Sequence, residues 1–557
     1  MLELMENTGP CLSTELTSLL VEKHGLSAEA ARKRVSRGCP GLKRLAYLPF
    51  PRKAKFLYLQ QDYRSQQYWA SLKEAILSSS SAYASAYAAL LQRGGIIPKV
   101  HFPIACGAPL RQKKHLSSDT ILSRLKLANI IDEIEVPGVG ICIVLAEATA
   151  SFDPDYSRLK ARLITEAILL KAIRMWARNL GLVSFDKVEL RDENEAMPRV
   201  GTFAWDLTGP SYLAHMVDWG KDGKLAPGFI ACDVLLDTKV TELGLRPFLH
   251  KCSTLRNLKR VGRCFSMFVA DSYSKDAFRK AKESGIVPAT PETLFGTEVA
   301  QGLIQLTKVL TDAARASIKP EVFAEMFQRL GKIEGAATNL RGALFEYIAA
   351  DLVRQTISAS VTLNKIFRDD TGTLAAEVDL IAVEGKRAVY FIECKGYQPS
   401  GTIEDEEVEQ WLTKRIPIVR QHALRHPDWK SLELHFEFWT TGKLSENAAA
   451  RIKHAKASTS KYIVEFRDAD GVYAYAQGTK DPSLIGTLKQ HFLEHSMATA
   501  ERDVTARADR QERDSQRRLL HHQKGSDPDF GIPEQFDKGL PNISEAKSCP
   551  ELLEMFG

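Results

Sequence analysis

The sequence has no CxxC pair, no apolar run of the ~18 residues that a membrane span needs, and no GxxxxGK[ST] phosphate loop. The 9 cysteines are scattered and have no histidine at zinc-finger spacing, so we expect reduced, mostly buried thiols. The acidic N-terminus MLELMENTGP is unlike a secretory signal. These absences predict a cytoplasmic protein without a membrane partner, in which any ATP-driven step needs a separate ATPase.

The chain length predicts the number of domains, and the charge distribution predicts where a basic surface lies. A chain of 557 residues exceeds one hydrophobic core and predicts three or four domains. The net charge of +6 is too small to indicate nucleic-acid binding by itself, but residues 1–60 hold ten Lys or Arg and five Glu. The basic partner surface is therefore expected in the N-terminal segment.

The N-terminal segment predicts winged-helix modules. Helical periodicity over 12–24, a second helix opening at Ser27 and an aromatic-rich hairpin over 45–59 give the order typical of a winged helix at residues 1–65. A similar order predicts a second winged helix at 66–150. A recognition helix and a wing would contact duplex DNA through Arg32, Lys33, Arg34, Arg37, Arg52, Lys53 and Lys55. The alternative is a protein-interaction module with a soluble basic face.

The remainder of the chain predicts two α/β blocks and a tail. Long helices alternate with short apolar strands over 151–335, and the same alternation begins again over 336–482. The segment 483–557 is charged and predicts a helix followed by a flexible tail.

The chemistry-bearing residues lie in the second of these blocks. In AVYFIECKG, Glu393 and Lys395 are two positions apart, so on a strand both side chains leave the same face. The EGK turn before this strand predicts a hairpin that brings Asp379, in EVDLIAV, beside Glu393. Glu346 on the preceding helix can supply a third carboxylate. Carboxylates that hold a cation, together with a lysine, are what phosphodiester hydrolysis requires.

An E-x-K triplet alone is weak, because the chain contains three. Glu384 and Lys386 lie in the predicted turn, and Glu545 and Lys547 lie in the polar tail. Only Glu393 and Lys395 follow an apolar strand and have an aspartate-bearing strand upstream. The alternative interpretation is an exposed ion pair on a strand face.

Glu346 on a leading helix, Asp379 on one strand and ECK at 393–395 on the next resemble the PD-(D/E)xK nuclease superfamily over about 339–475. The later portion FEFWTTGKLSENAAARIKHAK is similar to Mrr-like restriction endonucleases. The resemblance implies a restriction-endonuclease-like α/β fold, Mg²⁺ (or Mn²⁺) bound by Asp379 and Glu393 with Glu346 as the third carboxylate, and Lys395 as the catalytic lysine. Val378 replaces the eponymous proline.

The preceding block is predicted to be a degenerate copy of the same fold. GFIACDVLL aligns with YFIECKGYQ, so that Ala231 stands for Glu393 and Asp233 for Lys395. Asp206 would then stand for Asp379, and Glu166 for Glu346. Two alternatives stay open: a chance similarity of two buried strands, and an active site with migrated residues that uses Asp233 with Lys251 or Lys259.

The resulting hypothesis is a Mg²⁺-dependent DNA endonuclease that binds double-stranded DNA through its N-terminal modules. The family resemblance implies bacterial defence against phage or mobile DNA. The alternatives are the cutting subunit of a transposition or repair complex, and a DNA-binding sensor or scaffold whose nuclease a partner activates. A homo-oligomer is compatible with each of them.

Overall fold

The computed structural model describes residues 1–113, 115–149, 156–194, 196–219, 225–258, 261–313, 326, 329–330, 333, 336–369, 372, 374–397, 401–479 and 481–493. The chain divides into two compact units, Met1–Ala498 and Thr499–Gly557. The second unit lies outside the described residues, as does most of the predicted charged helix and tail at 483–557. Within the first unit the fold is mixed α/β.

The N-terminal segment contains three helices and a small sheet of order β1-β3-β2. The Ser27 hydroxyl caps the basic helix by accepting from the Ala30 amide. The predicted hairpin over 45–59 is wrong in its first strand, since residues 45–55 form the connection; Pro49 and Pro51 lack the N–H that a strand ladder needs. The elements are α1 (Leu2–Thr8), β1 (Cys11–Leu12), α2 (Ser13–His24), α3 (Ala28–Arg37), β2 (Leu42–Arg44), η1 (Pro51–Lys53) and β3 (Phe56–Leu59).

A second helical segment follows with its own antiparallel sheet of order β4-β6-β5. Its elements are α4 (Gln66–Leu77), α5 (Ala82–Gln92), β4 (Ile96–Pro98), α6 (Phe102–Ala105), α7 (Ser118–Leu127), β5 (Ile131–Val136), β6 (Gly140–Leu145) and α8 (Ala146–Thr149). Nearly every residue of α5 is buried, and most are alanine or other apolar residues. This helix therefore forms the centre of the segment's core.

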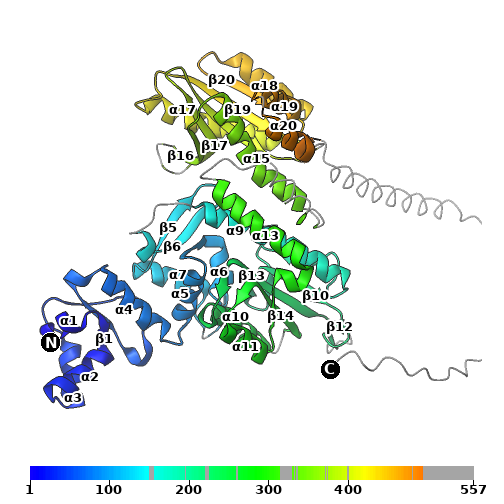
Figure 1. Cartoon of the computed structure of the whole chain (residues 1–557). Coiled ribbons are helices and arrows are strands. Elements are labelled where there is room, and N and C mark those ends of the chain that lie inside the picture. The colour runs from blue at the N-terminus through cyan, green and yellow to red at the C-terminus, as the bar shows by residue number, and fades with distance from the viewer. Residues whose placement is uncertain are drawn as a thin grey trace, which may run out of the picture. The chain divides into compact units, whose positions relative to one another are not determined.

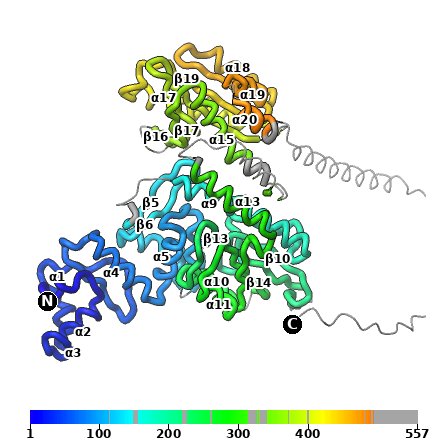
Figure 2. The backbone as a smooth tube through the Cα atoms, viewed as in Figure 1, coloured from blue at the N-terminus to red at the C-terminus, as the bar shows by residue number. Residues whose placement is uncertain are grey.

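The first α/β block, residues 156–313, has a five-stranded sheet of order β7-β10-β13-β14-β15. β10 pairs antiparallel with β7 and β13, whereas β13–β14 and β14–β15 are parallel. Helix α13 packs along α9, as Figure 1 and Figure 2 both show. The elements are α9 (Ser157–Asn179), β7 (Glu189–Leu190), β10 (Leu207–Ser211), β13 (Gly228–Val240), α10 (Glu242–Arg256), β14 (Cys264–Tyr273), α11 (Lys275–Glu283), β15 (Val287–Ala289), α12 (Pro291–Phe295) and α13 (Thr297–Ala313).

The second α/β block, residues 336–493, repeats this sheet topology. Its order is β16-β17-β18-β19-β20, with two antiparallel pairings followed by two parallel ones. A long helix precedes each sheet, α9 in the first block and α15 in the second. The elements are α15 (Ala336–Thr356), β16 (Val361–Arg368), β17 (Ala375–Glu384), β18 (Ala388–Lys395), α16 (Asp405–Gln410), η4 (Trp411–Arg415), α17 (Ile416–Arg425), β19 (Glu433–Thr440), α18 (Glu446–Ser458), β20 (Ile463–Arg467), α19 (Ala469–Thr479), α20 (Pro482–Leu488) and η5 (Lys489–Leu493).

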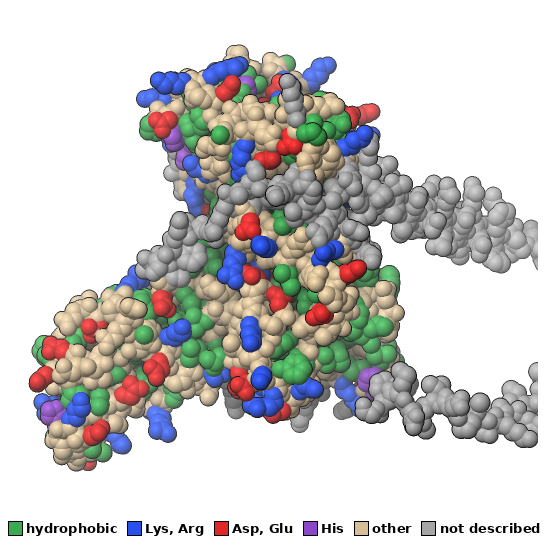
Figure 3. All heavy atoms as spheres, viewed as in Figure 1, with side chains coloured by type: hydrophobic (Ala, Val, Ile, Leu, Met, Phe, Trp, Pro, Cys, Tyr) green, Lys and Arg blue, Asp and Glu red, His purple; other side chains and the backbone are tan. Residues whose placement is uncertain are grey.

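Neither a membrane-spanning helix in the described residues nor a face of one charge in the view of Figure 3 is found. No helix within the described ranges is both long and apolar enough to cross a bilayer. On the face shown in Figure 3, basic and acidic side chains are interspersed. Eight cysteines are free, of which all but Cys39 and Cys264 are buried, and Cys549 lies outside the described residues.

Candidate active site

Two neighbouring strands of the second block bring the predicted residues together. The register of β17 and β18 pairs Leu380 with Ile392, so the next residues along, Asp379 and Glu393, lie side by side. The Asp379 Oδ2 atom accepts a hydrogen bond of 2.7 Å from the Cys394 amide. The Lys395 Nζ atom lies 2.9 Å from Glu393 Oε1. The structure therefore places Asp379, Glu393 and Lys395 in one cluster at the end of the hairpin.

The cluster concentrates negative charge in a buried place. The Asp379 carboxylate is 7% exposed and that of Glu393 is 3% exposed. Burial, followed by the charges of Glu393 and Glu346, raises the pKa of Asp379 well above its usual range. For Lys395 burial opposes the charged form, but the carboxylates of Glu393 and Asp379 outweigh it and raise the pKa of the ammonium group. Lys395 is thus held as a cation beside carboxylates that repel one another.

Glu346 reaches the same cluster from α15. Its charge acts on Asp379, as the raised pKa of that residue shows. Its Oε2 atom accepts a hydrogen bond of 3.1 Å from the Lys160 ammonium, whose Nζ also lies 3.0 Å from Asn364 Oδ1. Lys160 belongs to α9, and sequence reasoning did not identify it because nothing in the α9 pattern separates it from other helix lysines.

Arg415 is a second cation that sequence reasoning missed. It ends the π-helical turn Trp411–Arg415, and its guanidinium contacts Glu393 Oε1, the oxygen that Lys395 also contacts. The Arg415 side chain remains 35% exposed. A π turn widens the helix by one residue and redirects the side chains that follow, and such turns occur frequently at functional sites. The sequence carries no signal for this turn.

The donor set suits a hard divalent cation. Carboxylate oxygens are the ligands that Mg²⁺ and Mn²⁺ prefer, and carboxylates gathered in one place gain from a cation between them. In the described part of the chain, no three His, Cys, Asp or Glu side chains form a ready-made metal cage. Lys395, Arg415 and Lys160 instead neutralise the carboxylates, so ion binding requires these contacts to rearrange. Asp379, Glu393 and Glu346 are the residues that would hold the ion.

The first block carries a matching set of carboxylates, but not in the predicted alignment. Leu207 pairs with Cys232, so Asp206 lies beside Asp233, as Asp379 lies beside Glu393. The Asp206 Oδ2 atom accepts a bond of 2.8 Å from the Val234 amide, the counterpart of the Cys394 bond. Asp233 therefore corresponds to Glu393, and Leu235 to Lys395. The predicted alignment was wrong by two residues, because a shift of two keeps every side chain on its own face.

Buried cations hold the carboxylates of the first block. The Arg191 guanidinium donates to Glu166 Oε2 at 2.6 Å and to Asp206 Oδ1 at 2.8 Å. The Lys251 Nζ atom lies 2.5 Å from Asp233 Oδ2 and is 4.1 Å from the Trp205 ring centroid. Lys251 is fully buried. Lys259, the other lysine considered for migrated chemistry, lies outside the described residues.

The predicted DNA-binding side chains are exposed. Arg32, Lys33 and Arg34 lie on α3, as does Arg37, and each points into solvent. Lys33 forms an i,i+4 ion pair of 2.8 Å with Glu29, which leaves its side chain 67% exposed. Arg52, Lys53 and Lys55 lie in the connection between β2 and β3 and are exposed as well. These two groups therefore lie on α3 and on the β2–β3 connection.

The chain shows little similarity to known proteins. No protein-family model matches the chain, and no curated protein matches it significantly. The structure of the restriction endonuclease FokI aligns at 11% identity over 83% of this chain and 79% of that chain, with a TM-score of 0.18. FokI bound to DNA aligns at 11% identity over 80% and 79%, with a TM-score of 0.19. TM-scores this low carry no argument, so a functional conclusion depends on the site itself.

Proposed function

We propose that the chain is a metal-dependent DNA endonuclease of the PD-(D/E)xK type, with its active centre in the second block. The observation that supports this most is the cluster of Asp379, Glu393 and Lys395 on neighbouring strands. Two buried carboxylates and a lysine held as a cation are the groups that phosphodiester hydrolysis uses. Defence against phage or mobile DNA remains part of the proposal and rests on the family resemblance alone.

The chain's own residues divide the work in this proposal. Asp379, Glu393 and Glu346 would hold Mg²⁺ or Mn²⁺, and the ion would supply charge neutralisation at the scissile phosphate and acidify a water molecule. Lys395 donates to the phosphate or to the attacking water, since its ammonium group is charged and partly exposed. Once Glu393 holds the ion, the Arg415 guanidinium no longer has to neutralise that carboxylate and can bind a phosphate oxygen.

Duplex DNA is the proposed substrate. α3 and the β2–β3 connection present basic side chains to solvent, and a helix of this kind fits a major groove while the connection reaches phosphates. The first block, whose carboxylates are paired with Arg191 and Lys251, is proposed as a structural or DNA-gripping partner without a cutting centre of its own.

The decisive experiment incubates the purified full chain with supercoiled plasmid and with linear duplex DNA. Nicking or linearisation is expected with Mg²⁺ or Mn²⁺, and no reaction is expected with EDTA. Gel electrophoresis of the products measures the outcome. Cleavage that persists in EDTA would contradict a metal-dependent centre, and the absence of cleavage under all metal conditions would favour the sensor or scaffold alternative.

The DNA-binding proposal predicts a strong effect of charge reversal on α3. Replacing Arg32, Lys33 and Arg34 with glutamate should weaken duplex binding at all sequences and flatten its salt dependence. Each lost phosphate contact should reduce the slope of log affinity against log salt by about 0.9. Fluorescence anisotropy across a salt series measures both quantities.

Reversal of Lys430, an exposed lysine of the second block, to glutamate provides the charge control. The α3 variant should retain Mn²⁺ binding, because the metal residues belong to other elements. Unchanged affinity and slope in the α3 variant would assign its basic face to a protein partner or to solvent.

A further inference from the structure

A cavity of about 590 Å³ lies among α4, the end of α5, α9 and the start of α10, and none of the proposed metal-binding carboxylates lines it. This volume is within the range of small-molecule sites. Hydrogen bonds of Gln92 connect the elements that line the cavity. Its Nε2 donates to Thr238 Oγ1 at 3.0 Å, and its Oε1 accepts from the Thr241 amide at 3.1 Å. The cavity is therefore formed before any ligand enters.

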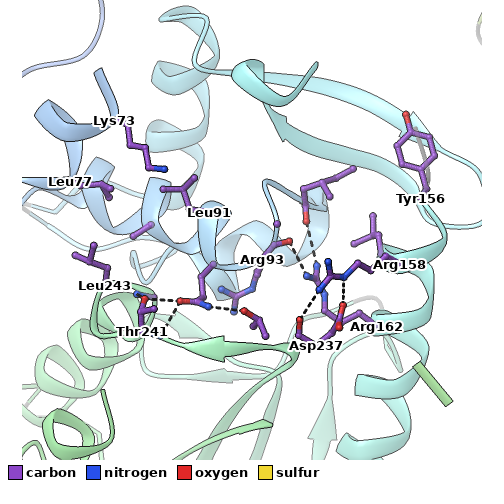
Figure 4. Close-up of a pocket in the computed structure, with 17 residues that line it drawn as sticks. Lys73, Leu77, Leu91, Arg93, Tyr156, Arg158, Arg162, Asp237, Thr241 and Leu243 are labelled. Carbon is purple, nitrogen blue, oxygen red and sulfur yellow. Dashed lines mark hydrogen bonds and ion pairs between the residues drawn. The ribbon is translucent and has the colours of Figure 1, made fainter. Parts of the chain in front are cut away.

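The cavity is lined by both apolar and charged side chains. Figure 4 shows Leu77, Leu91 and Leu243 on the same side as Lys73, with Arg158 and Arg162 on the other side. The charged side chains are Lys73, Arg93, Arg158 and Arg162, and Asp237 is the one carboxylate among the described lining residues. Arg158 and Arg162 are paired with carboxylates, so the positive charge that can act on a ligand in the cavity comes from Lys73 and Arg93.

Arg158 forms an ion pair with Asp237, and Arg162 forms one of 3.9 Å with Glu166 and also donates to the carbonyls of Arg93 and Ile96. Among the described residues no carboxylate forms an ion pair with Lys73, which is exposed at the cavity. Burial lowers the pKa of the Arg93 guanidinium, although the charges of Asp206, Glu166 and Asp233 oppose the shift, and a bound anion would further stabilise its charged form.

The start of α10 adds a positive pole. This helix spans 15 residues, its N-cap Thr241 lines the cavity, and so do Leu243 and Gly244 of the first turn. The N-terminal end of a helix carries partial positive charge and favours anions. The α10 N-terminus and the basic side chains therefore both favour an anion in this cavity.

The geometry points to a binding site for an organic phosphate of nucleotide size, with its phosphate near Lys73, Arg93 and the α10 N-terminus and its base against the leucines. The site is separate from the proposed nuclease centre and does not depend on it. The same chemistry is offered by a free nucleotide and by the terminal phosphate of a nucleic-acid strand.

Isothermal titration calorimetry of the full chain tests this site. The probes are ATP, deoxyadenosine monophosphate, inorganic phosphate, and a short duplex with or without 5′-phosphates, all in EDTA to prevent cleavage. Lys73→Glu reverses an exposed charge at the cavity. Leu243→Glu places a carboxylate in the first turn of α10, where it favours the helix but repels a phosphate. Lys187→Glu, at an exposed lysine outside the cavity, is the control.

Saturable binding of a nucleotide that Lys73→Glu and Leu243→Glu each weaken at least tenfold, and that Lys187→Glu leaves unchanged, would support the proposal. Binding of the phosphorylated duplex alone, with the same response to the variants, would identify a strand end as the source of the phosphate. No binding of any probe, or binding that neither cavity variant weakens, would overturn the proposed phosphate site. Thermal melting of each variant establishes that the fold is retained.

Discussion

Lys395→Ala is expected to lower the rate of plasmid cleavage by about 10²–10³-fold, while leaving the fold and duplex binding unchanged. The Lys395 ammonium lies 2.9 Å from Glu393 Oε1 and is the lysine of the carboxylate cluster. Its removal leaves the Glu393 charge in contact with Arg415, so the buried carboxylate keeps a partner. The initial rate of loss of supercoiled plasmid in Mg²⁺ measures the effect.

The chain supplies a matched control in the same hairpin. Lys386→Ala changes an exposed lysine in the turn between β17 and β18, two residues after Glu384, and should leave cleavage unchanged. Near wild-type cutting by folded Lys395→Ala protein would remove Lys395 from the active centre. A loss shared equally by both variants would indicate damage to the hairpin and not to the chemistry.

Lys251→Met is expected to destabilise the first block by about 3–5 kcal/mol, because it leaves the Asp233 charge buried without its cation. Lys251 is fully buried, lies 2.5 Å from Asp233 Oδ2 and donates to the carbonyls of Ile104 and Ala204. Chemical denaturation followed by circular dichroism measures the loss. Lys280→Ala, an exposed lysine of α11, should change stability by less than about 0.5 kcal/mol.

The pH dependence of the stability of the Lys251→Met variant shows whether the buried Asp233 charge causes the loss of stability. Burial raises the pKa of Asp233 to about 6, even though Lys251 opposes the shift. Without Lys251 that pKa rises further, so stability falls as pH increases between the unfolded value near 4 and the new folded value. The variant should therefore lose less stability at pH 5 than at pH 8. Adding Asp233→Asn should recover much of the loss at pH 8; failure to recover would assign the loss to the two carbonyls instead.

The clustering of Asp379, Glu393 and Lys395 could be predicted because their arrangement is local. Strand periodicity places Glu393 and Lys395 on one face, and the short EGK turn fixes the register that brings Asp379 alongside. The leading helix with Glu346 was equally clear from its apolar spacing. None of these inferences required knowledge of distant contacts.

The cations around these residues could not be predicted, since they arrive through tertiary packing. Lys160 comes from a helix of the first block, and Arg415 depends on a π turn that has no composition signal. Helix α10, which carries Lys251, was missed because Pro247 lies inside it and proline ordinarily interrupts a helix. Strand β16 was missed because VTLNKIFR lacks a continuous apolar run.

Under the proposed function, Leu235 at the position that corresponds to Lys395 leaves each molecule with one cutting centre. The two strands of a duplex run in opposite directions, so breaking both in one encounter takes two cutting centres of opposite orientation. A chain with one open centre would instead release a singly nicked circle before any linear product. A double-strand break would then depend on a second molecule or a second encounter, and the linear product would gain on the nicked one as protein concentration rises.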